Sequence, residues 1–503
     1  MQVQELTGAG NSGAGDSAGV PGMTRQAGVG PTQVERLAAF VQRASYSEIS
    51  EDARQALKIR VLDSIACAIG ALDAPPVLRL RAYLEDVGGN PLVTLIGSGG
   101  DKASPEGAAL YNSALVRYLD FNDSFLAKGE TCHPSDNVGA MLAASEYAGA
   151  SGQHFLTALA VAYQVQCRLS EEAPVRAKGF DHTTQGAYAV AAGVSKALGL
   201  DTAKTANAIA ISGTAYNALR VTRTGRLSNW KGLAYPNTAF DAVHATFLAK
   251  HGITGPMEVF EGNKGFMESV AGCFELDWSK EDLEAVRRTI LKKYNAEIHS
   301  QSVLEGVLDL RAAHNFSPHE VECVRIEVFD VAYNIIGGGE EGDKRVVHTK
   351  EEADHSLPYM VAVALLDGEV TPAQYLPERI LREDAQTLLR QVIVRPDVGF
   401  SKRFPGEMCC RVRIQLADGR ELTVEKRDYE GFLTRPMSWE HLALKLDNLA
   451  APYTDATMRR EIVQMVSELD TIQVSGLMRL LARVRIGAAA EVQTTKEEAS
   501  HER

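Results

Sequence analysis

The sequence predicts a mainly α protein: a large all-helical domain built from both ends of the chain, with an inserted, smaller α+β domain. Its 503 residues exceed the roughly 100–200 of a typical domain, so we expect two domains. Apolar residues recur at helical spacing from about 33 to 275 and again from 438 to about 481. The stretch between them contains segments that alternate apolar and polar residues, as half-buried strands do.

These patterns divide the chain into five parts. The parts are a disordered tail (1–30), the first part of the helical domain (31–289), an α+β lid domain (290–435), the C-terminal part of the helical domain (436–486) and a flexible tail (487–503). The first tail holds eight glycines and no aromatic residue, so it cannot bury enough apolar surface to offset its ordering entropy.

The large domain is expected to begin with a helix at Thr32, which forms a capping box with Glu35. Gly252 is a suitable C-cap for the last helix of its first part. Several of the segments are apolar on more than one face, which indicates helices buried among other helices. The further helical segments are 52–72, 106–119, 137–149, 154–169, 184–198, 202–219 and 238–251.

The small domain is expected to combine strands with short helices. A strand is predicted over 322–331, and two more over 408–416 and 421–426 flank Asp418–Gly419, a good hairpin turn. Helical stretches are predicted near 354–366 and 382–391.

Composition narrows the classes of function. The charge sum of 52 basic and 65 acidic residues is −13, so no basic surplus favours nucleic acid as a partner. No 18-residue apolar run or signal-peptide pattern appears, so we expect no membrane span and a cytoplasmic location. The seven cysteines are scattered without a CxxC motif, which favours neither a disulfide framework nor a metal site. No phosphate-binding glycine loop is present, so no cofactor is predicted.

The densest polar segment lies between two apolar helices. It contains Asp120, Asp123, Ser124, His133 and Asp136, and constrained loops on a rigid scaffold commonly present reactive groups. In the alternative interpretation, Asp120 and Asp136 only cap helices and His133 is a hydrogen-bonded loop residue.

Three further segments offer polar side chains of the same kinds. His182 precedes an apolar helix, where a packing role is equally common, and His299 lies at the domain junction, where ligands often bind. Arg220, Arg223 and Lys231 follow another apolar helix; they suit the clamping of carboxylates, although a solvated basic loop has the same composition. Together these residues suit a small polyanionic acid, with cations neutralising carboxylates and a histidine or carboxylate transferring the proton.

Four ordered motifs resemble those of the MmgE/PrpD family, most like its 2-methylcitrate dehydratase branch. They are Leu62-Asp63-Ser-Ile-Ala-Cys67, Tyr118-Leu-Asp120-Phe-Asn-Asp123, His133-Pro-Ser-Asp-Asn137 and Ala296-Glu-Ile-His299-Ser-Gln. The resemblance runs from about 33 to 480. It implies a helical domain formed by both chain ends with an inserted lid domain, a homodimer, no metal, and a role in propionate catabolism through the methylcitrate cycle.

The resemblance also assigns roles to single residues. It implies that His133, His299, Lys231, Asp120 and His182 are catalytic, and that Ser124 and Tyr359 bind substrate. Arg220 and Arg223 are expected to bind substrate as well, because their guanidinium groups suit carboxylates. Ser124 stands where many members carry threonine, and Asp181 separates His182 from the glycine and aromatic residue that usually precede it directly. We expect His133 and His299 to transfer protons, with Asp120 orienting or tuning one of them.

The function expected from this resemblance is that of a cofactor-independent hydro-lyase. It would remove water from 2-methylcitrate or citrate to give a cis-aconitate-type alkene. A decarboxylase or isomerase of cis-aconitate or a related tricarboxylate is the first alternative. A non-catalytic binding protein with the family fold is the second.

Overall fold

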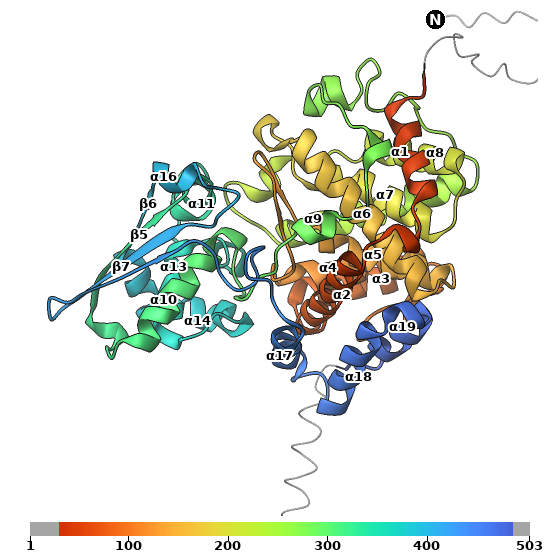
Figure 1. The fold of residues 1–503 in the computed structure, drawn as a ribbon. Coiled ribbons are helices and arrows are strands. Elements are labelled where there is room, and N and C mark those ends of the chain that lie inside the picture. The colour runs from red at the N-terminus through yellow and green to blue at the C-terminus, as the bar shows by residue number, and fades with distance from the viewer. Residues whose placement is uncertain (1–29, 486–503) are drawn as a thin grey trace, which may run out of the picture.

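The computed structural model describes residues 30–485, which form two lobes (Figure 1). The apolar core of the large lobe takes residues from Val34 to Leu291 and again from Met437 to Val484. A second apolar core, from Ile290 to Phe432, fills the small lobe. Both ends of the described chain therefore belong to the large lobe. The tails predicted over 1–30 and 487–503 lie outside the described residues apart from Gly30, and the exact domain boundaries stay a prediction.

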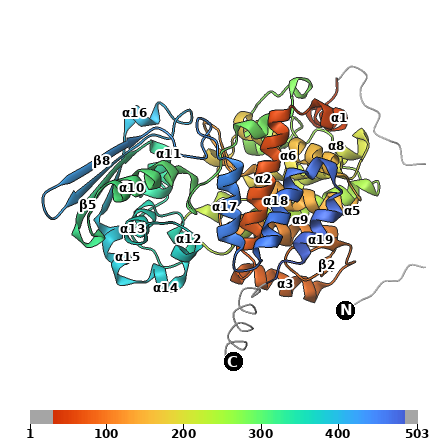
Figure 2. The same cartoon turned by 60° about the horizontal axis from the view of Figure 1, so that its bottom comes forward.

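The large lobe is a stack of helices, and the mainly α class predicted from periodicity is confirmed. Its helices are α1 (Gln33–Arg43), α2 (Glu51–Gly70), α3 (Pro75–Val87), α4 (Pro105–Tyr118), α5 (Val138–Tyr147), α6 (Gly152–Glu172), α7 (Thr183–Ala197), α8 (Thr202–Ala215), α9 (Trp230–Lys250), α17 (Trp439–Ala450), α18 (Ala456–Ser467) and α19 (Val474–Ala482). Helix α17 packs against α2 from the opposite end of the sequence (Figure 2).

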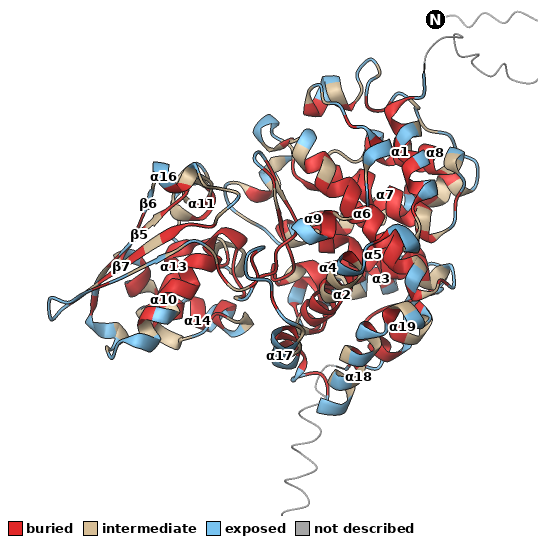
Figure 3. Ribbon diagram, in the orientation of Figure 1, coloured by how far each residue is buried: buried red, intermediate tan, exposed pale blue. Residues whose placement is uncertain are grey.

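Small residues allow the central helices to approach closely. A Cβ on Gly193 of α7 would lie only 2.7 Å from the Met141 sulfur and 3.0 Å from the Ala158 carbonyl oxygen. The central helices α4, α6 and α7 are accordingly buried along most of their length, whereas exposed surface concentrates on the outer helices and loops (Figure 3).

The small lobe is a four-stranded sheet with helices against it. The strands are β5 (Val321–Val328), β6 (Val392–Pro396), β7 (Cys410–Leu416) and β8 (Glu421–Lys426), in the order β6-β5-β7-β8. Strands β5 and β6 are parallel, and the other neighbours are antiparallel. Helices α10 (Gln301–Ala313) and α13 (Leu357–Asp367) pack on the sheet, and the strictly alternating burial of β7 reflects that one-sided core.

Several predicted elements are confirmed, and others shift for identifiable reasons. The capping box of Thr32 and Glu35 is present, and the β7–β8 hairpin turns at Gly419, whose φ of +89° is left-handed. The helix predicted over 202–219 ends at Ala215, so the apolar residues after it lie in a loop. The helix predicted from 238 begins at Trp230 instead and continues through Pro236.

Helix α3 and strand β6 are among the elements absent from the prediction. Helix α3 begins at two prolines, which suit the first turn of a helix, and its apolar residues Val77, Leu80, Leu84 and Val87 do recur at helical spacing, so this signal was missed. Strand β6 is short and lies at the sheet edge, so its sequence carries little alternation. Among residues 30–485 no single helix combines the length and apolarity of a membrane span, and only α2 and α3 taken together, bent by 86°, meet those two criteria.

Candidate active site

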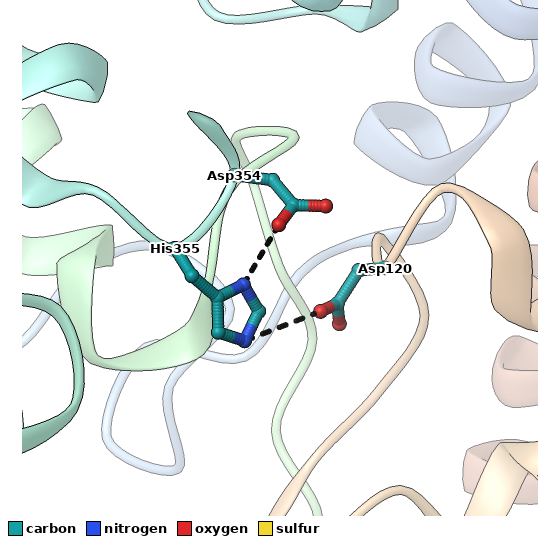
Figure 4. Close-up of side chains that lie close together, drawn as sticks. All are labelled: Asp120, Asp354 and His355. Carbon is teal, nitrogen blue, oxygen red and sulfur yellow. Dashed lines mark hydrogen bonds and ion pairs between the residues drawn. The ribbon is translucent and has the colours of Figure 1, made fainter. Parts of the chain in front are cut away.

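The functional side chains gather where the two lobes meet. Asp120 follows α4 in the large lobe, and Asp354 and His355 precede α13 in the small lobe. The three side chains point toward one another across the boundary (Figure 4). His355 lies 2.8 Å from Asp354 through Nδ1 and 3.8 Å from Asp120 through Nε2. Asp120 has a φ of +52°, a strained conformation for a residue with a side chain, which turns its carboxylate inward.

Four cations surround these two carboxylates, and we call Arg117, Lys231, Lys292 and Lys350, with Asp120 and Asp354, the cationic cluster. Arg117 Nη1 and Lys292 Nζ each donate to Asp120 Oδ1 at 2.6 Å. On the other carboxylate, Lys231 Nζ donates to Asp354 Oδ1 at 2.6 Å, and Lys350 Nζ lies 2.8 Å from Oδ2. Asp136 Oδ2 also lies 3.5 Å from Arg117 Nε, so four positive groups face three carboxylates, and the remaining positive charge favours an anionic ligand.

The surroundings change the proton affinities within this cluster. Burial alone would raise the pKa of Asp120, but Arg117 and Lys292 outweigh burial and hold it well below its usual value. Burial lowers the pKa of Lys231 to about 8, although Asp354 and Asp120 oppose this shift. Lys231 is therefore mostly charged at neutral pH and gives up its proton more readily than an exposed lysine.

The same residues do not fit a divalent cation. Ligand atoms of Asp120, Asp354 and His355 lie within 4.8 Å of one another, a spacing that suits a metal ion. Both carboxylates, however, already receive ammonium or guanidinium groups at 2.6–2.8 Å. A metal ion at this position would stand among four positive charges, so we assign no metal to the cluster.

A second group lies within the large lobe, and we call His133 and His182, with Asp123, Ser124 and Asp181, the histidine pocket. His133 Nδ1 lies 2.8 Å from the Asp123 carbonyl oxygen and 3.0 Å from Ser124 Oγ. Because a carbonyl only accepts hydrogen bonds, Nδ1 carries the proton and Nε2 is left to accept one. The His182 ring packs edge-on against His133, with centroids 5.5 Å apart.

Both imidazoles are neutral at physiological pH. Burial lowers the pKa of His182 to about 3, with the opposing effect of Asp181 too small to reverse it. Burial, together with Arg117 and Lys292 of the cationic cluster, holds the pKa of His133 well below its usual value. His182 Nδ1 lies 3.3 Å from Asp181 Oδ1, and Nε2 is buried without a hydrogen-bond partner among the described residues.

His299 forms a third element, from the small lobe. Its Nδ1 lies 2.6 Å from Glu297 Oε1, and its backbone N–H donates to the other oxygen of the same carboxylate. The ring packs against Phe329 and Phe404, and Nε2 has no hydrogen-bond partner within residues 30–485. Buried imidazole nitrogens of His182 and His299 thus have no hydrogen-bond partner in the described part of the chain.

Not every residue singled out from the sequence joins these groups directly. Arg223 holds Asp181, its Nε donating to Oδ2 at 2.6 Å, so it acts on His182 through that carboxylate. Arg220 pairs with Glu341 of the small lobe at 2.7 Å. The Tyr359 hydroxyl donates to the Gln374 carbonyl inside the small lobe. Tyr359 therefore contributes no hydroxyl to the cluster in this structure.

Asp120 orients neither histidine by a hydrogen bond, although its charge opposes the lowering of the His133 pKa. Its carboxylate binds cations and approaches His355, whereas the Nδ1 atoms of His133 and His299 have other partners. The sequence interpretation missed Arg117, Lys292, Lys350, Asp354 and His355. One signal existed for Arg117, a charged residue within the otherwise apolar segment 106–119, whereas Lys292 lies among other charged residues and carried no such signal.

Little room is left beside the cluster. The cavity lined by Arg117, Asp120, Lys231 and Lys350 measures about 10 Å³, which is room for about one water molecule. A multicarboxylate ligand would therefore require the two lobes to separate before it could reach the cluster.

Comparisons with known proteins show which sequences this chain resembles. The family models of the MmgE/PrpD N-terminal and C-terminal domains match residues 35–279 and 294–471. A protein of Salmonella typhi named 2-methylcitrate dehydratase is 27% identical over 74% of this chain and 78% of its own length. A Mus musculus protein named cis-aconitate decarboxylase is 25% identical over 89% of this chain and 93% of its own length. The mitochondrial 2-methylcitrate dehydratase of Yarrowia lipolytica is 26% identical over 77% of this chain and 78% of its own.

Proposed function

Because the chain belongs to the MmgE/PrpD family, we propose that it is a hydro-lyase of a tricarboxylic acid, 2-methylcitrate or citrate, forming a cis-aconitate-type alkene. The observation that carries this proposal is the pairing of buried, neutral imidazoles with a surplus of buried cations. Such an elimination needs a base for a C–H proton beside a carboxylate, an acid for the leaving hydroxyl, and cations for the developing enolate charge.

The residues can be assigned to these tasks. His133 is suited to act as the base, since Nδ1 is held by the Asp123 carbonyl and Nε2 is unprotonated. Lys231, with a pKa of about 8, is suited to donate a proton to the leaving hydroxyl. Lys292 and Arg117, which both bind Asp120, are placed to stabilise negative charge on the substrate. His299 approaches from the small lobe, with its free Nε2 available for a second transfer.

No cofactor is required in this scheme. The cationic cluster supplies the positive charge that a metal ion would otherwise provide, and the imidazoles and Lys231 supply the proton transfers. The small lobe would act as a lid, since its closure excludes water and strengthens the electrostatic interactions within. A homodimer and a cytoplasmic location remain part of the proposal and rest on the family resemblance.

Decarboxylation is the competing activity, and the similarity to the mouse protein named cis-aconitate decarboxylase supports it. The same cations would hold the carboxylates while carbon dioxide leaves, and Lys231 or a histidine would protonate the resulting carbanion. Isomerisation of a related acid would use the same groups without net loss of water or carbon dioxide. A binding protein with this fold would catalyse none of these reactions.

A substrate panel separates these activities. Purified full-length protein is incubated with 2-methylcitrate, citrate and cis-aconitate, while alkene absorbance and carbon dioxide release are followed. The proposal predicts alkene formation from 2-methylcitrate or citrate without carbon dioxide. Carbon dioxide release from cis-aconitate would replace it with decarboxylation, and the absence of any conversion would remove the enzymatic interpretation.

A further inference from the structure

One ion-paired glutamate crosses the lobe boundary next to the histidine pocket. Glu341 lies in a glycine-rich loop of the small lobe, residues 337–345, and only 5% of its side chain is exposed. Its Oε1 accepts a hydrogen bond from Arg220 Nη2 at 2.7 Å and another from Arg176 Nη2 at 3.2 Å. Both arginines belong to the large lobe, so a carboxylate of one lobe occupies a two-arginine site of the other.

Two short helical turns of the large lobe position the two arginines. Each lies in a short three-ten helix, Arg176–Lys178 or Arg220–Arg223, and their guanidinium groups converge on a single oxygen atom. Burial, together with the neighbouring charge of Arg220, lowers the pKa of Arg176, which is the response expected when two like charges are held together. Paired guanidinium groups are strong, geometrically specific ligands for carboxylates.

Arg220 approaches the carboxylate beside His182, and Arg176 lines an opening at the surface. Arg220 Nη1 is 4.0 Å from Asp181 Oδ2, and Asp181 is the carboxylate beside His182. On the outer side, a groove of about 170 Å³ at the lobe boundary is lined by Arg176, Glu340 and Phe404, among others. Phe404 in turn packs on His299, with ring centroids 5.7 Å apart. A ligand entering by this groove would therefore meet Arg176.

The loop that carries Glu341 is built to be displaced at small cost. It contains four glycines, and Gly338 and Gly342 have φ values of +102° and +91°, which a residue with a side chain rarely adopts. Glu340, Gly342 and Asp343 are exposed, so moving this stretch gives up little apolar burial.

We propose that Arg176 and Arg220 form a carboxylate-binding subsite, which Glu341 occupies as an internal ligand until a carboxylate of the substrate replaces it. The proposal rests on the proposed function only for the nature of that substrate, an acid with several carboxylates. Glu341 then competes with substrate, and the protein without substrate is held closed by an ion pair that the incoming ligand breaks.

Binding of non-reactive carboxylates tests this subsite directly. Tricarballylate lacks the hydroxyl that dehydration removes, and succinate is a simpler probe, so calorimetry measures their binding to the full-length protein without turnover. In the Glu341→Gln variant the arginines lose their charged internal partner, so both probes are expected to bind about five-fold more tightly than to the wild type. The gain should disappear when Arg176→Gln and Arg220→Gln are added.

Asp343→Asn is the matched control, because it removes one negative charge from an exposed residue of the same loop that pairs with Arg345 and not with the arginine pair. Binding to this variant should stay close to that of the wild type. An equal gain in both variants, no gain in Glu341→Gln, or weaker binding in it would overturn the subsite. Weaker binding would indicate that Glu341 holds the lobes closed over the ligand.

The result of this binding test can be distinguished from the result of the substrate panel that tests the proposed function. If the wild type converts a tricarboxylate but Glu341→Gln gains no affinity for the probes, the subsite fails and the function stands. If no tricarboxylate is converted but Glu341→Gln binds succinate more tightly, the subsite stands and the function fails. If neither occurs, both are wrong.

Discussion

The cationic cluster and the histidine pocket are both buried, and burial favours the neutral form of a side chain in each, yet the two regions end in different charge states. In the cluster, carboxylates and cations lie 2.6–2.8 Å apart, so the acids stay ionised although they are removed from water. In the pocket, the imidazoles face carbonyl, hydroxyl and aromatic neighbours, and burial leaves them neutral. The difference indicates a division of labour, in which one region holds negative charge and the other accepts a proton.

The largest effect on activity is expected from a substitution of His133 in the histidine pocket. His133→Asn can still donate to the Asp123 carbonyl from its amide nitrogen, but it has no basic nitrogen to replace Nε2. If His133 is the base, turnover of 2-methylcitrate should fall about 10³-fold, within the range typical of general base catalysis. Steady-state kinetics should place the loss in kcat, with KM changed little. Loss confined to KM would instead make His133 a binding residue.

The proposed role of Lys231 in the cationic cluster predicts how activity depends on pH. Lys231 donates its proton only while charged, and its pKa of about 8 means that it loses this proton as the pH rises through 8. Activity is therefore expected to fall above about pH 8.

In a Lys231→Arg variant the residual activity should lose that alkaline decline, because a guanidinium stays protonated. The pH–rate profile of both proteins, at saturating substrate, measures this. An alkaline limb that is identical in the two proteins would assign the proton to another group.

Removing one cation from the cluster should cost stability. Lys292 is fully buried and donates to both the carbonyl and the carboxylate of Asp120. Lys292→Met leaves that carboxylate with fewer partners, so the free energy of unfolding should fall by about 3 kcal/mol.

Lys293→Met is the matched control, since the Lys293 side chain is 36% exposed and pairs with Glu430 near the surface. Its loss should cost less than about 1 kcal/mol. Denaturant unfolding measures the free energy of unfolding of both variants. Equal losses would mean that the buried charge of Lys292 contributes no more to stability than an exposed charge does.

The smallest effect on stability and activity is expected at Tyr359, whose hydroxyl forms no hydrogen bond with the cationic cluster or the histidine pocket. Tyr359→Phe removes the hydrogen bond to the Gln374 carbonyl and should cost about 1 kcal/mol of stability. Activity should stay close to that of the wild type. A large fall in kcat at unchanged stability would show that Tyr359 turns toward the substrate during turnover.

More of the fold than of the candidate site could be predicted from the sequence. Helical spacing predicted α2, α4, α6 and α7, because each is long and its apolar faces repeat without interruption. Strand β6 escaped prediction, because a short edge strand carries too few residues to show a period. The resemblance supplied the family, which the matches over 35–279 and 294–471 establish.

Only part of the site could be predicted from the sequence, because some of its residues lie in recognisably polar segments and others are defined by partners far away in the sequence. His133, Lys231 and Asp120 lie in conspicuously polar segments. Lys292 and Asp354 function through partners more than 120 residues away in the sequence, which spacing cannot reveal. The partners of Arg220 and Arg223 depend on tertiary contacts in the same way. One arginine meets Glu341 across the lobe boundary, and the other meets Asp181 within its own lobe.

The central claim is that this chain handles a tricarboxylate with its own cations and imidazoles. Its most direct test is the rate of alkene formation from 2-methylcitrate by protein that has been treated with a strong chelator and then desalted. The account predicts the same rate before and after treatment, and no increase when divalent cations are added back. A rate that collapses with the chelator and returns with a metal ion would contradict it.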